Sequence, residues 1–410
     1  MVDIWLPYGK TEVHARISSE NLMEIAEVHR EPGLGDAAKE IEKAIEGATL
    51  PDIMSRAVQL GGKIVLALNV PEINLAKYVV SSVIRVAEKV GVKIADLVVL
   101  HMKNSFIHGI THNFEGISPL GVNIVTHDPF NGNIYICDIG SGVKVYLNRT
   151  FYEANAKIVA STFEPNPYTL YNCCESGLTF GLTGIETIKG ILNSILDLED
   201  LQERLFNEAI EVAKIAKIDF SISIVRSFSG EVIKCFAGEP EETLHGSLNV
   251  ADSLYKVSFT GRPDVIIISP GGAPFDNNLL SACGCLENAI KIVKKNGFVI
   301  LVAECSEGYG ETGFHQMVKR VRGDLKILEE VLRSDFNVNG FIFYRFLRAL
   351  KKANLAMVSA VPDYYASEIP GLKIFRSVND ALNNALSKLG AKAKITVVPH
   401  GNFIIPVIKE

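Results

Sequence analysis

From Thr260 onwards the sequence repeats one unit, in which a short apolar run is followed by a glycine-containing loop and then by an amphipathic stretch. We expect strands at 264–269, 298–305, 355–360 and 372–376, and helices at 286–295, 324–334, 342–354 and 378–389. Strands that alternate with helices pair in parallel, because each crossover helix packs on a face of the sheet. The sequence therefore predicts an α/β fold whose C-terminal part is a doubly wound, mostly parallel sheet.

The chain is too long for one ordinary hydrophobic core, because it has 410 residues. The first 255 residues mix strand-like and helical patterns, including helices expected at 75–91 and 200–217. The last strand-like stretch, 394–407, is expected to return to this first part. We predict an N-terminal domain formed by 1–255 plus 393–410, a C-terminal domain formed by 256–392, and a ligand cleft between them.

Composition excludes several classes of protein. The longest apolar runs are only strand-sized, which argues against a membrane-spanning helix, and the N-terminus lacks the pattern of a secretory signal. A net charge of −6 without basic blocks argues against nucleic acid as a partner. An odd number of cysteines, seven, does not indicate a disulfide framework. We expect a cytoplasmic protein with a small-molecule partner.

Two glycine loops follow expected strands and are candidate ligand sites. In a parallel sheet, ligands bind beyond the carboxyl ends of strands, where glycines let backbone N–H groups approach an anion. The candidate ligand-binding residues are Ser269, Gly271, Gly272 and Asp276 in the first loop, and Glu307, Gly308 and Gly310 in the second. An ordinary turn explains the first loop equally well. The second also matches the pattern G-x-G-x-x-G, which leaves nicotinamide binding as a weak alternative.

Several of these stretches, taken in order, resemble the nickel-dependent lactate racemase family over nearly the whole length. They are residues 6–10, 127–128, 146–149, 154–159, 235–238, 261–276, 303–310 and 398–401. The resemblance implies a two-domain α/β enzyme that racemises or epimerises 2-hydroxy acids. It also implies a nickel pincer cofactor that is tethered by a lysine and ligated by a histidine, with two further histidines as acid and base.

The residues that would build such a site are mostly replaced in this chain. The positions of the family's arginine and of its cofactor lysine are Leu75 and Phe180, and the nickel histidine falls near Ser194. No histidine occurs between His127 and His245. The family's glutamine and lysine are replaced at the positions Ser281 and Gly284. We therefore expect that the tethered nickel cofactor is not used.

Four cysteines lie in the loops where the resemblance places the cofactor. They are Cys173, Cys174, Cys283 and Cys285. If the four thiols converge, they suit zinc, copper(I) or an iron–sulfur cluster, because thiolates are soft ligands. Small buried side chains and a redox pair remain alternatives, since neither C-C nor C-x-C is a standard zinc-binding spacing.

A polar cluster follows the strand expected at 97–100. Its candidate catalytic residues are His101, Asn104 and His108, with His112 a weaker candidate. Histidine suits acid–base work because its ordinary pKa lies near neutral pH. A solvated loop histidine is an equally simple interpretation.

These observations favour a racemase-like scaffold that binds or transforms a small hydroxy or oxo acid without the nickel site. One alternative is a non-catalytic relative that binds a ligand, a metal or a partner protein. A second is a standard nickel-dependent racemase. The sequence does not decide whether the chain is an enzyme, nor its oligomeric state.

Overall fold

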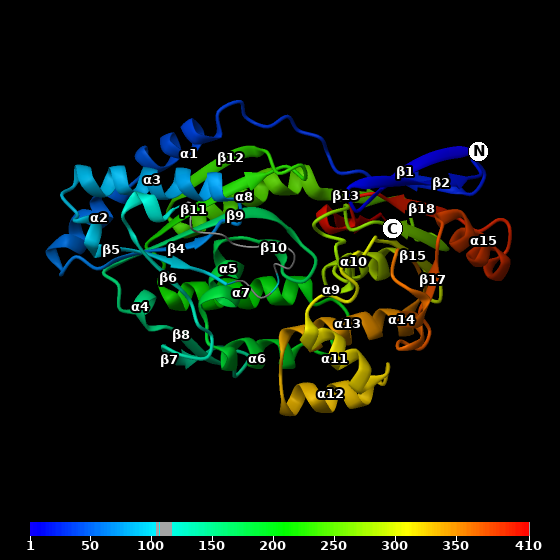
Figure 1. Ribbon diagram of the computed structural model, residues 1–410. Helices are drawn as coiled ribbons and strands as arrows, with labels where there is room; N and C mark the ends of the chain where they lie inside the picture. Colours follow the sequence, from blue (N-terminus) through cyan, green and yellow to red (C-terminus); the bar gives the residue numbers. More distant parts are fainter. Residues whose placement is uncertain (104–105, 107–116, 410) are drawn as a thin grey trace. The chain divides into compact units, whose positions relative to one another are not determined.

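The computed structural model describes residues 1–103, 106 and 117–409 (Figure 1). The chain forms two compact units. The C-terminal unit contains Met1–His29, Pro165–Tyr168 and Tyr255–Glu410, and the central unit contains Arg30–Glu164 and Thr169–Leu254.

The C-terminal unit is built on a sheet with strand order β17-β16-β15-β14-β18-β3. All neighbouring strands in it are parallel. Its strands are β3 (Leu22–Ile25), β14 (Val265–Ile268), β15 (Phe298–Val302), β16 (Asn354–Val358), β17 (Lys373–Phe375) and β18 (Ile395–Val398). The doubly wound parallel sheet predicted from the sequence is confirmed.

Both faces of this sheet are buried, which explains why its strands are continuous apolar runs. Val265 and Ile267 of β14 share one core with α15 (Val378–Leu389) and the hairpin of β1 (Val2–Tyr8) and β2 (Thr11–Ile17). Successive side chains of a strand point to opposite faces. The other face is covered by α10 (Cys285–Ile292) and α13 (Val338–Lys352). The remaining elements are α9 (Leu279–Ala282), α11 (Thr312–Val321), α12 (Leu325–Ser334), α14 (Asp363–Ser367), β13 (Lys256–Phe259) and β19 (Ile405–Ile408).

The two ends of the chain differ from the expected domain boundaries. We expected the tail, 393–410, in the N-terminal domain, but β18 lies between β14 and β3, and β19 pairs in parallel with β13. The first 29 residues join the same unit. An apolar run shows that a strand will be buried, but it does not show which sheet the strand enters.

The central unit has a second mostly parallel sheet, with strand order β12-β11-β9-β4-β5-β6 and β10 paired with β9. Only the β11–β12 pair in this order is antiparallel. The strands are β4 (Ile64–Asn69), β5 (Leu97–His101), β6 (Asn123–Thr126), β9 (Ala156–Asn166), β10 (Leu170–Asn172), β11 (Phe220–Arg226) and β12 (Val232–Gly238). A separate antiparallel pair is formed by β7 (Asn133–Asp138) and β8 (Lys144–Asn148).

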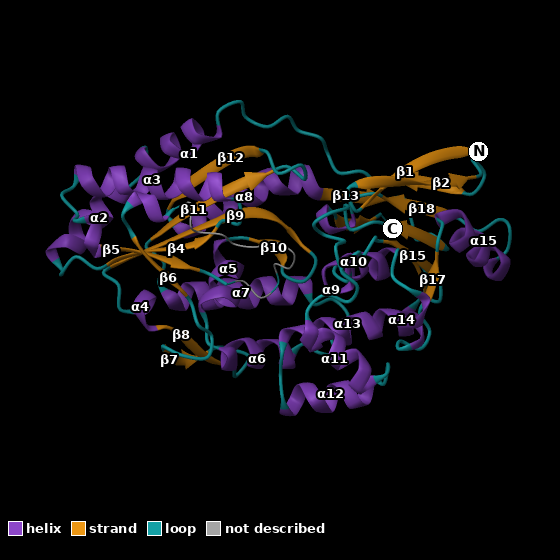
Figure 2. Cartoon of the chain, viewed as in Figure 1, coloured by secondary structure: helices purple, strands orange, loops and turns teal. Residues whose placement is uncertain are grey.

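Helices cover both faces of the central sheet. Figure 2 shows α1 (Ala37–Glu46) and α3 (Ile73–Lys89) on one side of the strands, and α5 (Cys174–Leu182) and α7 (Gln202–Ala216) on the other. The first side shares one large apolar core with the strands. The other helices are α2 (Leu50–Gln59), α4 (Arg149–Tyr152), α6 (Ile185–Ser194) and α8 (Pro240–Tyr255). Within the described ranges, no helix combines the length and apolarity that a bilayer span requires.

Candidate functional site

The carboxyl ends of the parallel strands in the central unit gather polar side chains. Asn69 ends β4, His101 ends β5 and Arg226 ends β11, while Ser161 of β9 is in register with Asn69. This edge is where ligands bind in open parallel sheets. It is therefore the first place to look for a functional site.

One part of this edge is a buried amide network centred on Asn69. The Asn69 side-chain amide donates to Ser161 Oγ at 3.1 Å and to Asn172 Oδ1 at 2.9 Å. The Asn172 amide donates in turn to Thr162 Oγ1 at 3.0 Å. Gly177 of α5 lies against Asn69, since a Cβ at Gly177 would stand only 2.6 Å from Asn69 Nδ2. These side chains hold β4, β9, β10 and α5 together, and they are positioning residues.

A second part of the same edge is charged. Arg226 Nη2 lies 3.5 Å from Glu164 Oε2, and Arg226 Nη1 lies 3.9 Å from Glu72 Oε2. Tight charge-assisted hydrogen bonds are shorter, at about 2.7–2.9 Å. Both distances to the guanidinium are longer than that of a direct charge-assisted hydrogen bond. Because a guanidinium presents a planar fork that matches a carboxylate, Arg226 is the candidate acid-binding group.

Of the expected catalytic residues, the structure describes only His101, since Asn104, His108 and His112 lie outside the described residues. His101 is 7% exposed at the end of β5. Between it and Arg226 lie β4 and β9, so the strand order separates their strands by three spacings, or about 14 Å. Their strands are therefore not neighbours in the sheet. A catalytic role for these four residues stays a prediction.

In the first predicted ligand loop, after β14, polar groups form hydrogen bonds with another part of the chain. Ser269 Oγ donates to the Pro7 carbonyl at 2.6 Å, and the Ala273 N–H donates to the Gly9 carbonyl at 2.8 Å. Asp276 is fully buried, and its Oδ2 accepts from the Gly9 N–H at 2.7 Å. The turn between β1 and β2 is thus tied to this loop by both side chains and backbone.

Backbone conformation and close packing explain why this loop has two glycines. Gly271 and Gly272 have φ angles of +124° and +75°, which side chains rarely adopt. A Cβ at Gly272 would also stand 2.9 Å from the Gly9 carbonyl oxygen. Ser269 and Asp276 have structural partners in the same way, so an anion-binding role for these four residues stays a prediction.

The second predicted loop, after β15, is also occupied by neighbouring groups. The Gly308 carbonyl accepts from the Leu279 N–H at 2.9 Å, and Glu307 Oε2 accepts from the Asn278 amide at 3.1 Å. A Cβ at Gly310 would stand 2.9 Å from the Asn278 side chain.

Tyr309, between the two glycines, is buried and donates its hydroxyl to the Tyr365 carbonyl at 2.7 Å. These contacts account for the first two glycines of the G-x-G-x-x-G pattern without a dinucleotide. The ligand-binding role of Glu307, Gly308 and Gly310 therefore stays a prediction.

The first cysteine pair is buried in the central unit. Cys173 caps the N-terminus of α5, where its Sγ lies 3.4 Å from Ser176 Oγ. Cys174 Sγ donates to the Ile222 carbonyl at 3.4 Å. Burial raises the pKa of both thiols well above the usual value for cysteine. Both are therefore expected to remain protonated thiols.

The second cysteine pair is buried in the C-terminal unit. Cys285 Sγ donates to the Ala282 carbonyl at 3.4 Å, and burial raises the pKa of both Cys283 and Cys285. Across the described residues, no three His, Cys, Asp or Glu side chains are grouped so that they could hold a metal ion. The thiolate site formed by these two pairs stays a prediction that the local geometry does not support.

The positions at which the resemblance places the cofactor groups do not suit a tethered pincer. Phe180 is fully buried in α5 and meets the Phe106 ring edge-on at a centroid distance of 4.9 Å. Leu75 is buried in α3, and Ser194 Oγ donates to the Ile191 carbonyl at 2.7 Å. These residues offer no amine for attachment and no imidazole for nickel. The expectation that the tethered nickel cofactor is not used stays a prediction.

His127 is held by hydrogen bonds within the central unit. Its Nε2 donates to the Thr183 carbonyl at 3.0 Å, and its Nδ1 accepts from the Asn148 amide at 3.1 Å. Burial lowers the pKa of His127, so the ring is neutral. Asp128 accepts from the Phe130 N–H at 2.9 Å and shapes the following turn.

The C-terminal third of the chain matches a known family model. Residues 260–406 match the lactate racemase C-terminal domain. This part of the chain is similar to the C-terminal domain of lactate racemases. The family resemblance inferred from the sequence is thereby confirmed.

Curated relatives and a solved structure extend this likeness to the whole chain. The lactate racemase of Lactiplantibacillus plantarum is 22% identical over 99% of this chain and 100% of its own. The lactate racemase of Thermoanaerobacterium thermosaccharolyticum is 23% identical over 68% of each chain.

The structure of the lactate racemase apoprotein from Thermoanaerobacterium thermosaccharolyticum matches the full length of both chains with a TM-score of 0.85 at 20% identity. A protein from Thermotoga maritima matches with a TM-score of 0.58 at 14% identity, over 88% of this chain and 97% of its own. The lactate racemase-like architecture thus covers both units.

Sequence reasoning missed Arg226, Asn69 and Asn172. Each of the three is the last residue of a strand, and Asn69 and Arg226 follow apolar runs. A polar residue that ends a buried strand was the available signal. It was weak, because the order of the strands in the sheet was needed to bring them to one edge.

Proposed function

We propose that this lactate racemase-like protein binds a small 2-hydroxy or 2-oxo acid through Arg226, without the nickel pincer cofactor. The observation that carries the proposal is the guanidinium at the carboxyl edge of the central sheet, oriented by Glu164 and Glu72 at 3.5 and 3.9 Å. A ligand carboxylate can approach such a group with two parallel hydrogen bonds.

The class of ligand comes from the relatives. Two curated relatives are lactate racemases, and lactate is a 2-hydroxy acid whose oxidised counterpart is a 2-oxo acid. Both forms carry the carboxylate that Arg226 would recognise. The arginine takes over a role that Leu75 cannot perform, because Leu75 is an apolar side chain buried in α3.

The absence of suitable residues argues against racemisation through nickel. The sequence has no histidine between His127 and His245, and Phe180 supplies no amine. His101 and Arg226 are carried by strands that are three spacings, about 14 Å, apart, so the two residues are not neighbours in the sheet. We therefore favour binding over a racemase reaction.

The proposed location is the cytoplasm. All seven cysteines are free thiols. Free thiols persist in reducing compartments.

The proposal is tested by combining metal analysis with ligand titration. Protein purified without oxygen is assayed for nickel, and L-lactate, D-lactate and pyruvate are titrated into it by calorimetry. We expect substoichiometric nickel, saturable binding of at least one acid, and no interconversion of the lactate enantiomers on chiral chromatography. Stoichiometric nickel with racemisation, or failure of every acid to bind, would overturn it.

A further inference from the structure

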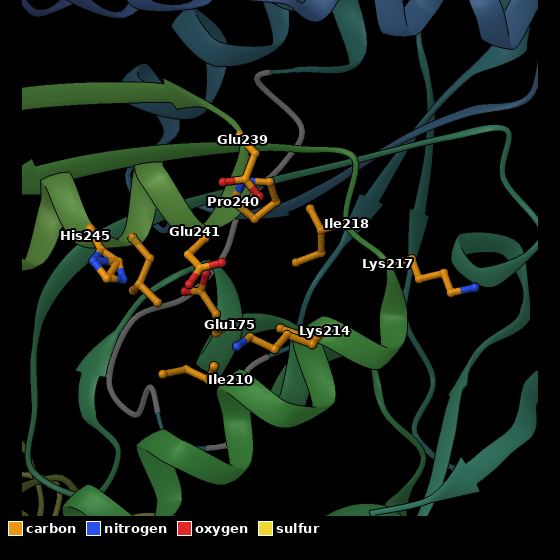
Figure 3. A pocket seen from close by; sticks show the side chains of 11 residues that line it. Glu175, Ile210, Lys214, Lys217, Ile218, Glu239, Pro240, Glu241 and His245 are labelled. Carbon is orange, nitrogen blue, oxygen red and sulfur yellow. The ribbon is translucent and has the colours of Figure 1, made fainter.

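The central unit contains a cavity far from the strand edge that carries Arg226. Its volume is ≈ 410 Å³, within the usual range of sites for small ligands. It lies among the start of α5, the last turns of α7 and the start of α8 (Figure 3). Its apolar wall is formed by Ile210, Ala213, Ile218, Pro240 and Leu244.

The innermost polar group of this cavity is the carboxyl of Glu175. The residue is only 5% exposed, and Figure 3 shows its side chain directed into the cavity. Among the described residues, no basic group forms an ion pair with it, and its side-chain contact is with the Cys173 thiol. A buried carboxylate without a cation is unfavourable, and burial raises the pKa of Glu175 accordingly. The cavity therefore places an unmatched acid where a ligand would sit.

Three carboxyl groups, two lysines and one histidine line the cavity. Glu239 and Glu241 line the same cavity, and Figure 3 shows the Glu241 carboxyl directed inward. Lys214 also points inward, whereas Lys217 is directed away from the centre. The two carboxyls directed inward, Glu175 and Glu241, thus share the space with one inward lysine, and His245 also lines it. The local charge favours a cationic ligand over an acid.

The apolar walls of the cavity favour an organic cation over a bare metal ion. A bare metal ion needs several oxygen ligands at about 2–2.6 Å and gains nothing from aliphatic walls. The wall side chains Ile210, Leu244 and Pro240 instead suit a hydrocarbon body. We propose that this cavity binds a small organic ammonium compound, whose amine pairs with Glu175 and Glu241 and whose apolar body packs on α7 and α8.

The proposal is tested by titrating three molecules of the same length into the full-length protein. n-Butylammonium carries the charge that we propose, n-butanol is neutral and butyrate is anionic. We expect calorimetry to show saturable binding of n-butylammonium and binding at least about tenfold weaker for the other two, because a charged hydrogen bond is lost. Equal binding of n-butanol, or tighter binding of butyrate, would overturn the proposal.

Variants connect the binding to the cavity. Glu175→Gln keeps the side-chain shape, and Glu241→Gln changes an exposed residue, so at least the second is expected to fold normally. Each should weaken n-butylammonium binding about tenfold or more. Lys217→Gln is the matched control and should leave the affinity unchanged. Wild-type affinity in both glutamate variants, or no saturable binding by the wild-type protein, refutes the proposal. Lactate titrations of the same variants report separately on the acid site at Arg226.

Discussion

Replacing Arg226 tests the proposed acid site, because the loss of its guanidinium allows the change in the dissociation constant to be predicted. The side chain is 15% exposed, and its carboxylate neighbours lie at 3.5 and 3.9 Å. A hydrogen bond to a charged partner contributes about 1.5–3 kcal/mol. Arg226→Ala should therefore raise the dissociation constant for the bound acid by about 10- to 150-fold.

The neighbouring carboxylate gives a control of opposite sign. Glu72 is 46% exposed and lies 3.9 Å from the guanidinium, so it repels an incoming acid and competes with it. The interaction of two unit charges at 4 Å in water is about 1 kcal/mol. Glu72→Gln should tighten acid binding, by no more than about fivefold.

Both variants are assayed by calorimetric titration of the acid that binds the wild-type protein, after thermal melts have confirmed that they fold. A purely structural role for Arg226 does not predict tighter binding in Glu72→Gln. Unchanged affinity in Arg226→Ala, or weaker binding in Glu72→Gln, would refute the reasoning.

Three further predictions concern stability. Arg345 forms two hydrogen bonds of 2.8 and 2.7 Å with Glu287, and both side chains are at most 4% exposed. In urea unfolding, Glu287→Gln should lower the free energy of unfolding by about 3–5 kcal/mol. Replacement of both residues by apolar ones should largely restore it. Phe180→Ala should cost about 3–5 kcal/mol in the same assay, and a loss under about 1 kcal/mol would contradict its place in the core. Because burial lowers the pKa of His127, the unfolded chain takes up a proton first as pH falls below about 6.5. Stability contributed by the neutral ring is present above that pH and is lost as pH falls towards the lowered pKa. In His127→Asn this part of the pH dependence should vanish. An unchanged dependence of stability on pH would contradict a buried neutral ring at His127.

The parallel sheet of the C-terminal unit could be predicted because its strands are recognisable in the sequence. Val265–Ile268 is a continuous apolar run between loops, and such a strand is stable only when helices bury both faces. The place of β18 could not be predicted in the same way. Its four apolar residues are compatible with either sheet, and only tertiary packing puts them between β14 and β3.

The candidate sites, too, could be predicted only in part from the sequence. The glycines after β14 were recognised from the sequence, but their reason is the approach of Gly9, a residue more than 260 positions away. Arg226 and Glu72 are 154 positions apart, and no local pattern connects them. Glu175 stands in an ordinary helical first turn, and only the folded unit places it in a cavity.

The central claim is that acid binding by this protein does not depend on nickel. The most direct test is calorimetric titration of lactate and pyruvate into protein that has been treated with a chelator and shown to be metal-free. We predict that the acid that binds the untreated protein binds the metal-free protein with the same dissociation constant. Loss of binding after metal removal, with recovery when nickel is restored, would contradict the claim.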